Sequence, residues 1–360
     1  MAAPAKKKYL APVGAGLPSP SKPIKILVTG GAGFIGSYLI KHWLKSDPHV
    51  TFVNLDKLTY SGDVSRLEEV RKNPRYTFIK GDICDSKVVQ RAIQGCSGIL
   101  HLAAETHVDR SLLDGKAFFD TNLYGTYVLL EAARKTGIER FLYVSTDEVY
   151  GSREKGFFKE NDAANPSSPY SVAKAAGDLL ALSYVGTHGM DVVVTRGSNT
   201  FGPYQYPEKV IPLFVSNALS GQKVPLYGDG LQIRNWIYVE DHCRGILTAF
   251  KKGKKGEAYN ISSKNDLTNI QMTRLLLKEL GKSESMIERV QDRLGHDRRY
   301  AIDSSKLRKL GWKEIFPFEL AFNSTIRWYC DNQAWWRQVR EKSSEFKKYY
   351  QKAYALRAKV

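Results

Sequence analysis

The sequence predicts an α/β fold in which helices cover both faces of a parallel β-sheet. Short β-branched or apolar runs alternate with helix-like stretches from Ile24 onward, and a glycine-rich turn joins the first strand to the first helix. Of the 360 residues, 42% are hydrophobic and 25% are charged. These are ordinary globular values, so a disordered or fibrous chain is excluded. A chain this long can bury a large core without metal or disulfide staples.

Six strands and at least two long helices are expected in the first two hundred residues. The strands are Ile26–Thr29, Thr51–Leu55, Tyr76–Ile79, Ile99–Leu102, Phe141–Ser145 and Val192–Thr195. The helices between them include Phe34–Leu44 and Ala117–Lys135. Strands that alternate with helices pair in parallel, because each helix returns the chain to the same end of the sheet. After Gly197 the alternation weakens and Gly and Pro become frequent, which indicates a smaller, loop-rich second region.

Four segments are therefore expected along the chain. Residues 1–23 form a flexible basic tail, 24–195 the sheet domain, 196–330 a second region interleaved with it, and 331–360 a basic C-terminal tail. The net charge is +17, of which the stretches 1–25 and 331–360 supply +10. A near-balanced body with basic ends favours solvated tails over a nucleic-acid-binding face, so nucleic acid is not an expected partner. Weak binding of polyanions by the tails is the alternative.

The four cysteines indicate a reducing compartment. None of Cys84, Cys96, Cys243 and Cys330 forms a Cys-x-x-Cys pair or stands at zinc-ligand spacing from a histidine, so no metal site is expected. No apolar run is long enough to span a bilayer. Prolines break the short apolar stretch near the N-terminus, which makes it a poor signal peptide. We expect a cytoplasmic protein without a membrane partner.

The turn after the first strand carries a dinucleotide-binding pattern. Gly30, Gly33 and Gly36 are spaced Gly-x-x-Gly-x-x-Gly, with Phe34 and Ile35 opening the following helix. Glycine lets the backbone approach a pyrophosphate, and the helix N-terminus supplies N–H donors and partial positive charge. An ordinary glycine-rich turn is the bland alternative. The position between strand and helix favours a Rossmann-type, doubly wound sheet that binds a dinucleotide.

The end of the second strand indicates NAD as the cofactor. Asp56 stands 20 residues after Gly36, where a carboxylate accepts hydrogen bonds from the adenosine ribose and repels a 2′-phosphate. Lys57 follows directly and weakens the preference for NAD over NADP. The ends of the third and fourth strands add candidates for the adenine and for close backbone approach, which are Asp82, Ile83, Leu102, Ala103 and Ala104.

A tyrosine and a lysine at helical spacing suggest an oxidoreductive step. Tyr170 and Lys174 are four residues apart and share one helix face. A nearby ammonium and a positively charged nicotinamide are expected to stabilise the tyrosine's phenolate, which could then accept a proton from a sugar hydroxyl. The pair alone occurs often by chance, and it gains meaning only downstream of the glycine turn.

Two adjacent acids follow the fifth strand. Ser145, Thr146, Asp147 and Glu148 stand at a strand's carboxyl end, where parallel sheets place their ligand sites. Alcohol oxidation needs neither acid, whereas an elimination uses one carboxylate to remove a C–H proton and one carboxylic acid to assist a leaving hydroxyl. A solvated acidic turn is the alternative.

The second region holds cations and amides without a diagnostic spacing. Lys209, Arg234 and Arg293 could bind a second pyrophosphate, although each by itself would be an ordinary surface cation. His296, by itself, is better explained as structural than as catalytic.

Together these residues resemble the extended short-chain dehydrogenase/reductases, and within them the nucleotide-sugar 4,6-dehydratases. The likeness runs from about Ile24 to about Trp336. It is carried by Asp56 to Thr59, His101 to Arg110, Thr146 to Glu148, Tyr170 to Lys174, Tyr204 to Lys209, and Asp292 to Tyr300.

The resemblance implies a lyase of deoxysugar biosynthesis that uses and regenerates NAD. Tyr170 is then the base for the 4-hydroxyl, with its pKa lowered by Lys174, and Thr146 hydrogen-bonds the sugar. Glu148 removes the C5 proton and Asp147 protonates the departing C6 hydroxyl. The implied substrate is dTDP-glucose, with UDP-glucose as the alternative, and the implied assembly is a homodimer on the helices near 117–135 and 168–186.

Further positions follow only from the resemblance. At the cofactor it places Lys57, Leu58, Thr59, Thr121 and Thr200. At the substrate it places Thr106, Asn199, Lys209, Val210, Pro225, Tyr227, Arg234, Asn260, Asp292, Arg293 and His296. The sequence departs from the common pattern at Arg196, Gly197, Thr200, Asn235 and Leu294, which affects the identity of the substrate rather than the catalytic set. The rival functions are 4-epimerisation or decarboxylation of a nucleotide sugar, and a non-catalytic binding protein.

Overall fold

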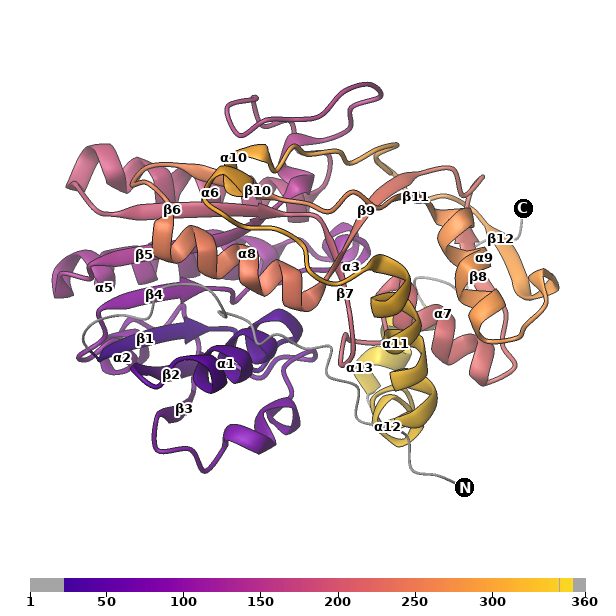
Figure 1. Cartoon of the computed structure of the whole chain (residues 1–360), viewed down its shortest axis with the longest axis horizontal. Coiled ribbons are helices and arrows are strands. Elements are labelled where there is room, and N and C mark those ends of the chain that lie inside the picture. Colours follow the sequence, from indigo (N-terminus) through magenta and orange to yellow (C-terminus); the bar gives the residue numbers. More distant parts are fainter. Residues whose placement is uncertain (1–22, 343, 352–360) are drawn as a thin grey trace.

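A seven-stranded parallel sheet forms the centre of the computed structural model, which describes residues 23–342 and 344–351 (Figure 1). Its strand order is β10-β6-β5-β4-β1-β2-β3, with every neighbouring pair parallel. The strands are β1 (Ile24–Thr29), β2 (Val50–Asp56), β3 (Tyr76–Lys80), β4 (Gly98–His101), β5 (Arg140–Thr146), β6 (Val192–Gly197) and β10 (Ala258–Ile261). The six strands expected from the sequence are confirmed with small shifts of their ends.

Helices cover both faces of this sheet, as the alternation in the sequence predicts. In β1, Ile26 and Val28 pack into one core, whereas Leu27 between them packs into the other. The first core includes residues of α1 (Phe34–Ser46) and α8 (Val239–Lys252). The second core lies under α2 (Ser86–Ala92), α5 (Thr126–Thr136) and α6 (Pro169–His188). Burial on both faces explains why these strands are continuously apolar.

Helix α6 begins at a well-defined N-terminus that fixes its first turns. The hydroxyl of Ser168 accepts a hydrogen bond from the amide of Ser171, and the Ser171 hydroxyl returns one to the Ser168 backbone. Pro169 occupies the first helical position, where its missing N–H costs nothing. Tyr170 and Lys174 therefore stand on the most firmly held part of this helix.

Shorter helical segments connect the strands. They are η1 (Val64–Val70), α3 (Val108–Leu113), α4 (Lys116–Phe119), the π-helical η2 (Asp120–Gly125) and η3 (Asp147–Tyr150). Segments α4, η2 and α5 follow one another without a break, which accounts for the single long helix expected over Ala117–Lys135.

Most of the second region lies at one end of the sheet, whereas its short helix α10 (Ser305–Lys309) packs beside β10 on the sheet itself (Figure 1). Its strands are β7 (Asn199–Phe201), β8 (Val224–Tyr227), β9 (Ile233–Tyr238), β11 (Asp266–Thr268) and β12 (Ile287–Val290), in sheets of three (β11-β9-β7) and two (β12-β8). Its helical segments are α7 (Val210–Leu219), α9 (Asn269–Glu279), η4 (Glu284–Met286), α10 (Ser305–Lys309) and α11 (Phe318–Asp331). Strand β10 comes from this stretch of chain yet pairs with β6. The central sheet therefore contains residues from both sides of the boundary expected at residue 195.

The expectation of a solvated basic tail over 331–360 is wrong for most of its length. Two helices, α12 (Gln333–Lys342) and α13 (Ser344–Tyr350), follow α11 directly. Trp336, Phe346 and Tyr349 are 1%, 3% and 4% exposed. Their apolar area outweighs the local positive charge, which long Lys and Arg side chains keep at the surface. The tail expected over 1–23 lies, up to residue 22, outside the described residues.

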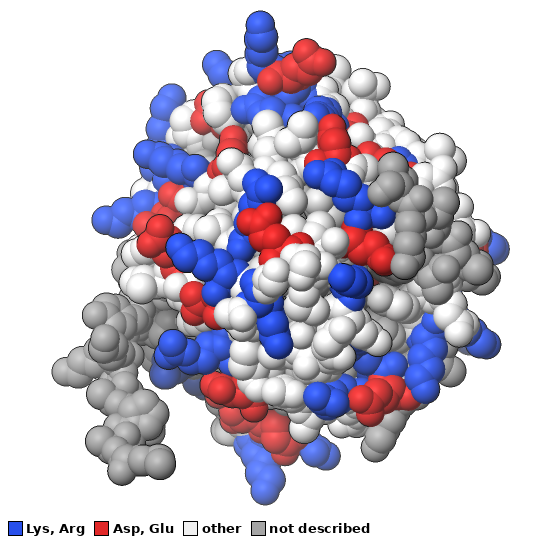
Figure 2. All heavy atoms as spheres, turned by 90° about the vertical axis from the view of Figure 1, so that its right-hand side faces the viewer, with Lys and Arg blue, Asp and Glu red and all other residues white. Residues whose placement is uncertain are grey.

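The surface of the second region mixes both signs of charge. Figure 2 shows Lys and Arg interspersed with Asp and Glu on this face, without one continuous basic patch. Among the described residues, none of the helices combines the length and the apolar character that crossing a bilayer requires.

Candidate active site

A cleft opens at the carboxyl ends of β1, β2, β4, β5 and β6 and collects most of the predicted site residues. On the cofactor side its lining includes Gly30, Gly33, Phe34, Ile35, Gly36, Asp56, Lys57, Thr59, Asp82, Ile83, Leu102, Ala103, Ala104, Thr121 and Thr200. On the reaction side it includes Thr106, Thr146, Asp147, Glu148, Tyr170, Lys174, Asn199 and Lys209. Residues far apart in the sequence thus share one cavity, at the edge where parallel sheets bind ligands.

The glycine turn is too crowded for side chains. Gly30 has a φ of +72°, and a Cβ atom there would lie 2.6 Å from the backbone nitrogen of Ala103. A Cβ on Gly36 would lie 2.4 Å from the carbonyl oxygen of Gly30. The close packing leaves backbone amides at the start of α1 facing the cleft, which suits the pyrophosphate of a dinucleotide.

The carboxylate of Asp56 is held in place by two backbone amides. Ala32 N–H and Leu58 N–H donate to its two oxygens, each over 2.8 Å. Burial raises its pKa, and these two hydrogen bonds act against that rise. Lys57 pairs with Asp82 over 2.7 Å, so its charge is directed at a neighbouring acid. Leu58 has a φ of +56° and contributes its amide to Asp56, but it is not among the residues that line the cleft.

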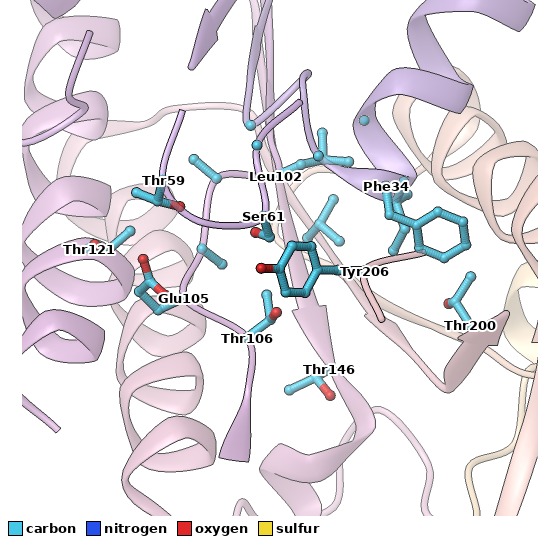
Figure 3. Close-up of a pocket in the computed structure, with 18 of the residues that line it drawn as sticks. Phe34, Thr59, Ser61, Leu102, Glu105, Thr106, Thr121, Thr146, Thr200 and Tyr206 are labelled. Atoms are coloured by element: carbon cyan, nitrogen blue, oxygen red, sulfur yellow. The ribbon is translucent and has the colours of Figure 1, made fainter. Parts of the chain in front are cut away.

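The two ends of the cleft differ in the side chains that they present. Figure 3 shows Thr59, Glu105 and Thr121 gathered at one end, Phe34 and Thr200 at the other, and the ring of Tyr206 between them. The Thr200 hydroxyl lies 2.5 Å from Nδ1 of His242, which also lines the cleft.

The acidic pair begins η3, directly after β5. Thr146 caps this turn, because its hydroxyl accepts a hydrogen bond from the Glu148 amide over 3.3 Å. Asp147 is 3% exposed, and its Oδ2 atom has no hydrogen-bond partner among the described residues. A buried carboxyl oxygen without a donor is costly when ionised. The solvated acidic turn considered from the sequence is therefore excluded.

The two carboxyl groups lie in different electrostatic surroundings. Burial raises the pKa of Asp147 strongly, and the neighbouring Glu148 raises it further. Burial also raises the pKa of Glu148, but Arg293, Arg234 and Lys209 all act against this rise. Asp147 is therefore the more readily protonated member of the pair.

The tyrosine–lysine pair differs from the expectation in one respect. Burial and, after it, Glu148 raise the pKa of Tyr170, although a hydrogen bond with Thr146 lowers it. Burial lowers the pKa of Lys174 to about 7. Its ammonium donates to the carbonyl oxygen of Val144 over 2.6 Å. Burial of the phenol therefore outweighs the influences that lower the pKa of Tyr170, and the lowering by Lys174 stays a prediction.

Cations from the second region surround Glu148. Lys209 donates to the backbone oxygen of Thr106 over 2.8 Å, and Arg293 lies 3.6 Å from a carboxylate oxygen of Asp109. The guanidinium of Arg234 stacks 4.0 Å from the ring of Tyr300, whose hydroxyl in turn lies 3.3 Å from Glu148 Oε2.

The remaining predicted substrate residues are half-buried neighbours of this cluster and do not line the cleft. Tyr227 donates to Asp109 over 2.6 Å, and His296 lies 2.6 Å from Asp292. Val210 is the first residue of α7, directly after Lys209.

Eight predicted substrate residues are not among those that line the cleft, namely Val210, Pro225, Tyr227, Arg234, Asn260, Asp292, Arg293 and His296. Asn260 is fully buried in β10, where its amide group accepts from Tyr150 and donates to the carbonyl of Phe158. The prediction that Asn260 binds the substrate is wrong, because both polar atoms of its side chain are already used. Pro225 is buried in β8 opposite Glu288 of β12 and does not line the cleft.

Several residues of the site escaped the sequence analysis. Tyr206, Glu208, His242 and Ser61 line the cleft, and Tyr300 contacts the acidic pair. Tyr206, Glu208 and Tyr300 lie inside the segments that carry the family resemblance, so those segments were the available signal. His242 and Ser61 had none, since only the folded chain brings them to the cleft.

A family model described as GDP-mannose 4,6 dehydratase matches residues 27–325. The chain belongs to this family. Among its relatives, the dTDP-glucose 4,6-dehydratase of Streptomyces niveus is 48% identical to this chain over 324 residues, which cover 88% of this chain and 96% of the relative. The dTDP-glucose 4,6-dehydratase 1 of Escherichia coli K12 is 46% identical over 341 residues, covering 87% and 94%.

Solved structures agree with this assignment. The dTDP-glucose 4,6-dehydratase of Streptomyces venezuelae, with NAD and dTDP bound, has a TM-score of 0.86 at 44% identity, covering 88% of this chain and 100% of that one. The Thermus thermophilus UDP-glucose 4-epimerase with NAD has a TM-score of 0.79 at 28% identity, covering 86% and 100%. The Rossmann-type fold and the family resemblance predicted from the sequence are confirmed.

Proposed function

We propose that this protein is an NAD-dependent hydro-lyase that converts dTDP-glucose to dTDP-4-keto-6-deoxyglucose, a step of deoxysugar biosynthesis. The observation that carries the proposal is the acidic pair of buried Asp147 and half-buried Glu148, which shares one cleft with Tyr170, Lys174 and the glycine turn. Simple oxidation or 4-epimerisation of a sugar has no use for two adjacent carboxyl groups with opposed surroundings, whereas elimination of water needs an acid and a base.

The cofactor side of the cleft suits NAD. The glycine turn carries no side chains, so the part of the cleft beside it is open to a ligand. The Asp56 carboxylate stands where it would meet a ribose. When bound, NAD supplies a group that accepts hydride from the sugar and later returns it. Gly30, Gly33 and Gly36 would hold its pyrophosphate, and Asp56 would exclude a 2′-phosphate.

The residues of the reaction side divide the proton transfers between them. Tyr170 takes the proton of the 4-hydroxyl, and positive charge brought against its hydroxyl must offset the effect of burial. Thr146 hydrogen-bonds the same part of the sugar. Once C4 is a ketone, the C5 proton is acidic, and Glu148 removes it. Asp147, kept protonated by burial, donates its proton to the departing C6 hydroxyl. The different surroundings of the two carboxyl groups support this assignment.

Thymidine is the proposed base, in line with the relatives named above. The alternative is UDP-glucose, which differs by one ring methyl and by a ribose 2′-hydroxyl. A methyl group discriminates by about 10- to 200-fold in a fitted pocket. A buried, unpaired 2′-hydroxyl would add to that discrimination.

A homodimer in the cytoplasm completes the proposal. Large apolar side chains are exposed on α3, η2, α5 and α6, which pack against one another. They are Leu112, Leu113, Tyr124, Tyr127, Val172 and Leu179. Exposed apolar side chains on neighbouring helices support association with a second copy of the chain. The four cysteines are free thiols, which fits a reducing compartment.

The decisive experiment compares dTDP-glucose with UDP-glucose on one preparation. We expect a 4-keto-6-deoxy product without net accumulation of NADH, and a larger kcat/KM for the thymidine nucleotide. Stoichiometric NADH with an oxidised sugar as final product would contradict the dehydratase. A kcat/KM ratio at or below one would overturn only the choice of base.

A further inference from the structure

The C-terminal helix α13 reaches the substrate end of the cleft. It begins 19 residues after the family model ends at 325. Phe346 packs against the cleft residue Tyr206 with a ring separation of 6.2 Å, and Tyr350 accepts a hydrogen bond from Asn217 of α7 over 3.2 Å. The helix is therefore docked on one side against α7 and on the other against the wall of the site.

The ring of Tyr349 completes a stack around Arg110. The Arg110 guanidinium lies 3.9 Å from the ring of Tyr60 and 4.4 Å from the ring of Tyr349. Arg110 donates to Glu208 over 2.8 Å, and Tyr60 donates to the other oxygen of the same carboxylate over 2.9 Å. A guanidinium held between two aromatic faces loses little further freedom when it binds a carboxylate. Glu208 lines the cleft and directly precedes Lys209.

The hydroxyl of Tyr349 meets a second set of groups. It lies 3.3 Å from His107 Nε2 and 3.5 Å from Asp109 Oδ2. Asp109 is the carboxylate that also contacts Tyr227 and Arg293. One side chain of α13 thus contacts Arg110, which pairs with Glu208 beside Lys209, and Asp109, which pairs with Arg293.

These two cations need such support because they share one small, buried region. Both act on the same carboxyl group, Glu148, and they repel each other. Cations that bind a diphosphate repel one another while the site is empty. Carboxylates fixed beside them reduce this repulsion before the ligand binds.

We propose that Tyr349 is a positioning residue that holds Lys209 and Arg293, through Arg110–Glu208 and Asp109, in the arrangement that binds the diphosphate of the nucleotide sugar. This inference rests on the proposed function. It assigns α13 to substrate affinity rather than to the chemical steps, since the ring of Tyr349 stacks on Arg110 and its hydroxyl meets His107 and Asp109.

The test uses the full-length protein and three variants. Tyr349→Ala removes the ring and the hydroxyl, whereas Tyr349→Leu keeps apolar bulk and tests the site if the alanine variant fails to fold. Tyr350→Ala is the matched control, because it loosens the same helix at its contact with Asn217. We measure KM and kcat for dTDP-glucose, and the Kd of dTDP alone by calorimetry.

Both Tyr349 variants should raise KM and the Kd of dTDP about tenfold or more, with kcat within about threefold of the unmodified protein. The Tyr350 control should leave all three constants within about threefold. Unchanged KM and Kd in Tyr349→Leu, a fall in kcat alone, or an equal loss in Tyr350→Ala would overturn the positioning role. If the unmodified protein neither binds dTDP nor converts dTDP-glucose, the proposed function fails, and this inference fails with it.

Discussion

At the scale of single residues, the positive charge near each carboxyl group determines how readily that group is protonated. Asp147 and Glu148 are adjacent in sequence, with Asp147 buried and Glu148 half-buried. Three cations oppose the rise in the pKa of Glu148, whereas Arg234 is the cation that opposes the rise for Asp147. Residue type and spacing could identify the pair, but not which member is the acid.

Replacing Glu148 tests that assignment. Glu148→Gln should reduce dehydration by roughly 10²-fold or more, the usual contribution of one general base, and oxidation at C4 should survive better. The measurement is exchange of the C5 proton with deuterated solvent, followed by mass spectrometry. Exchange at the unmodified rate in the variant would show that another group removes this proton. Asp147→Asn is the matched variant, and it should retain C5 exchange while blocking loss of the C6 hydroxyl.

A second buried acid, outside the cleft, should make stability depend on pH. Burial and Asp241 raise the pKa of Glu240 to about 7 from an ordinary 4.5, against the pull of Lys41, Arg244 and Lys45. The folded protein then binds more protons than the unfolded chain between these two pH values. The stabilising effect of protonation is complete below 4.5 and is lost as the pH rises to 7.

Glu240→Gln removes this dependence. The variant should be more stable than the unmodified protein by about 3 kcal/mol at pH 8, and the gain should be much smaller at pH 5. Urea unfolding at both pH values gives the two free energies. The exposed Glu279→Gln serves as control and should show no such difference between the two pH values. An equal gain at both pH values would assign the effect to packing instead of charge.

At the scale of elements, two glycines of the turn between β1 and α1 are needed for different reasons, Gly36 for packing and Gly33 for space that the cofactor would occupy. A Cβ on Gly36 would lie 2.4 Å from the Gly30 carbonyl oxygen, whereas a Cβ on Gly33 would lie 3.1 Å from it. Gly36→Ala should therefore cost about 1–3 kcal/mol of folding free energy through overpacking. Gly33→Ala should cost less than about 1 kcal/mol and should instead lose bound NAD, since its methyl group would stand in the pyrophosphate position. Unfolding free energies and the NAD content of the purified variants distinguish the two.

The elements also show where sequence reasoning succeeded and where it could not. Strands buried on both faces produce apolar runs, so β1, β2, β4, β5 and β6 were visible in the sequence. The half-buried edge strand β3 was visible through its aromatic and β-branched residues. The C-terminal helices were missed because their charge was counted and their aromatic residues were not, although Trp335, Trp336, Phe346 and Tyr349 mark an apolar face. Asn260 was misplaced because a family pattern gives residue types along the chain, and only the register of β10 with β6 shows that its side chain is consumed inside the protein.

At the scale of the whole molecule, the unpartnered surface on α5 and α6 gives the last prediction. Leu179 of α6 is 60% exposed, and Leu320 of α11 is 61% exposed, so the two leucines differ in location rather than in accessibility. In a twofold-symmetric dimer each patch meets its own copy, so one substitution places two charges in the same interface. Leu179→Arg should therefore convert a dimer to a monomer at micromolar concentration, whereas Leu320→Arg should not. Light scattering during size-exclusion chromatography gives both masses. A monomeric unmodified protein, or a dimer that survives Leu179→Arg, would show that the copies do not meet on this face.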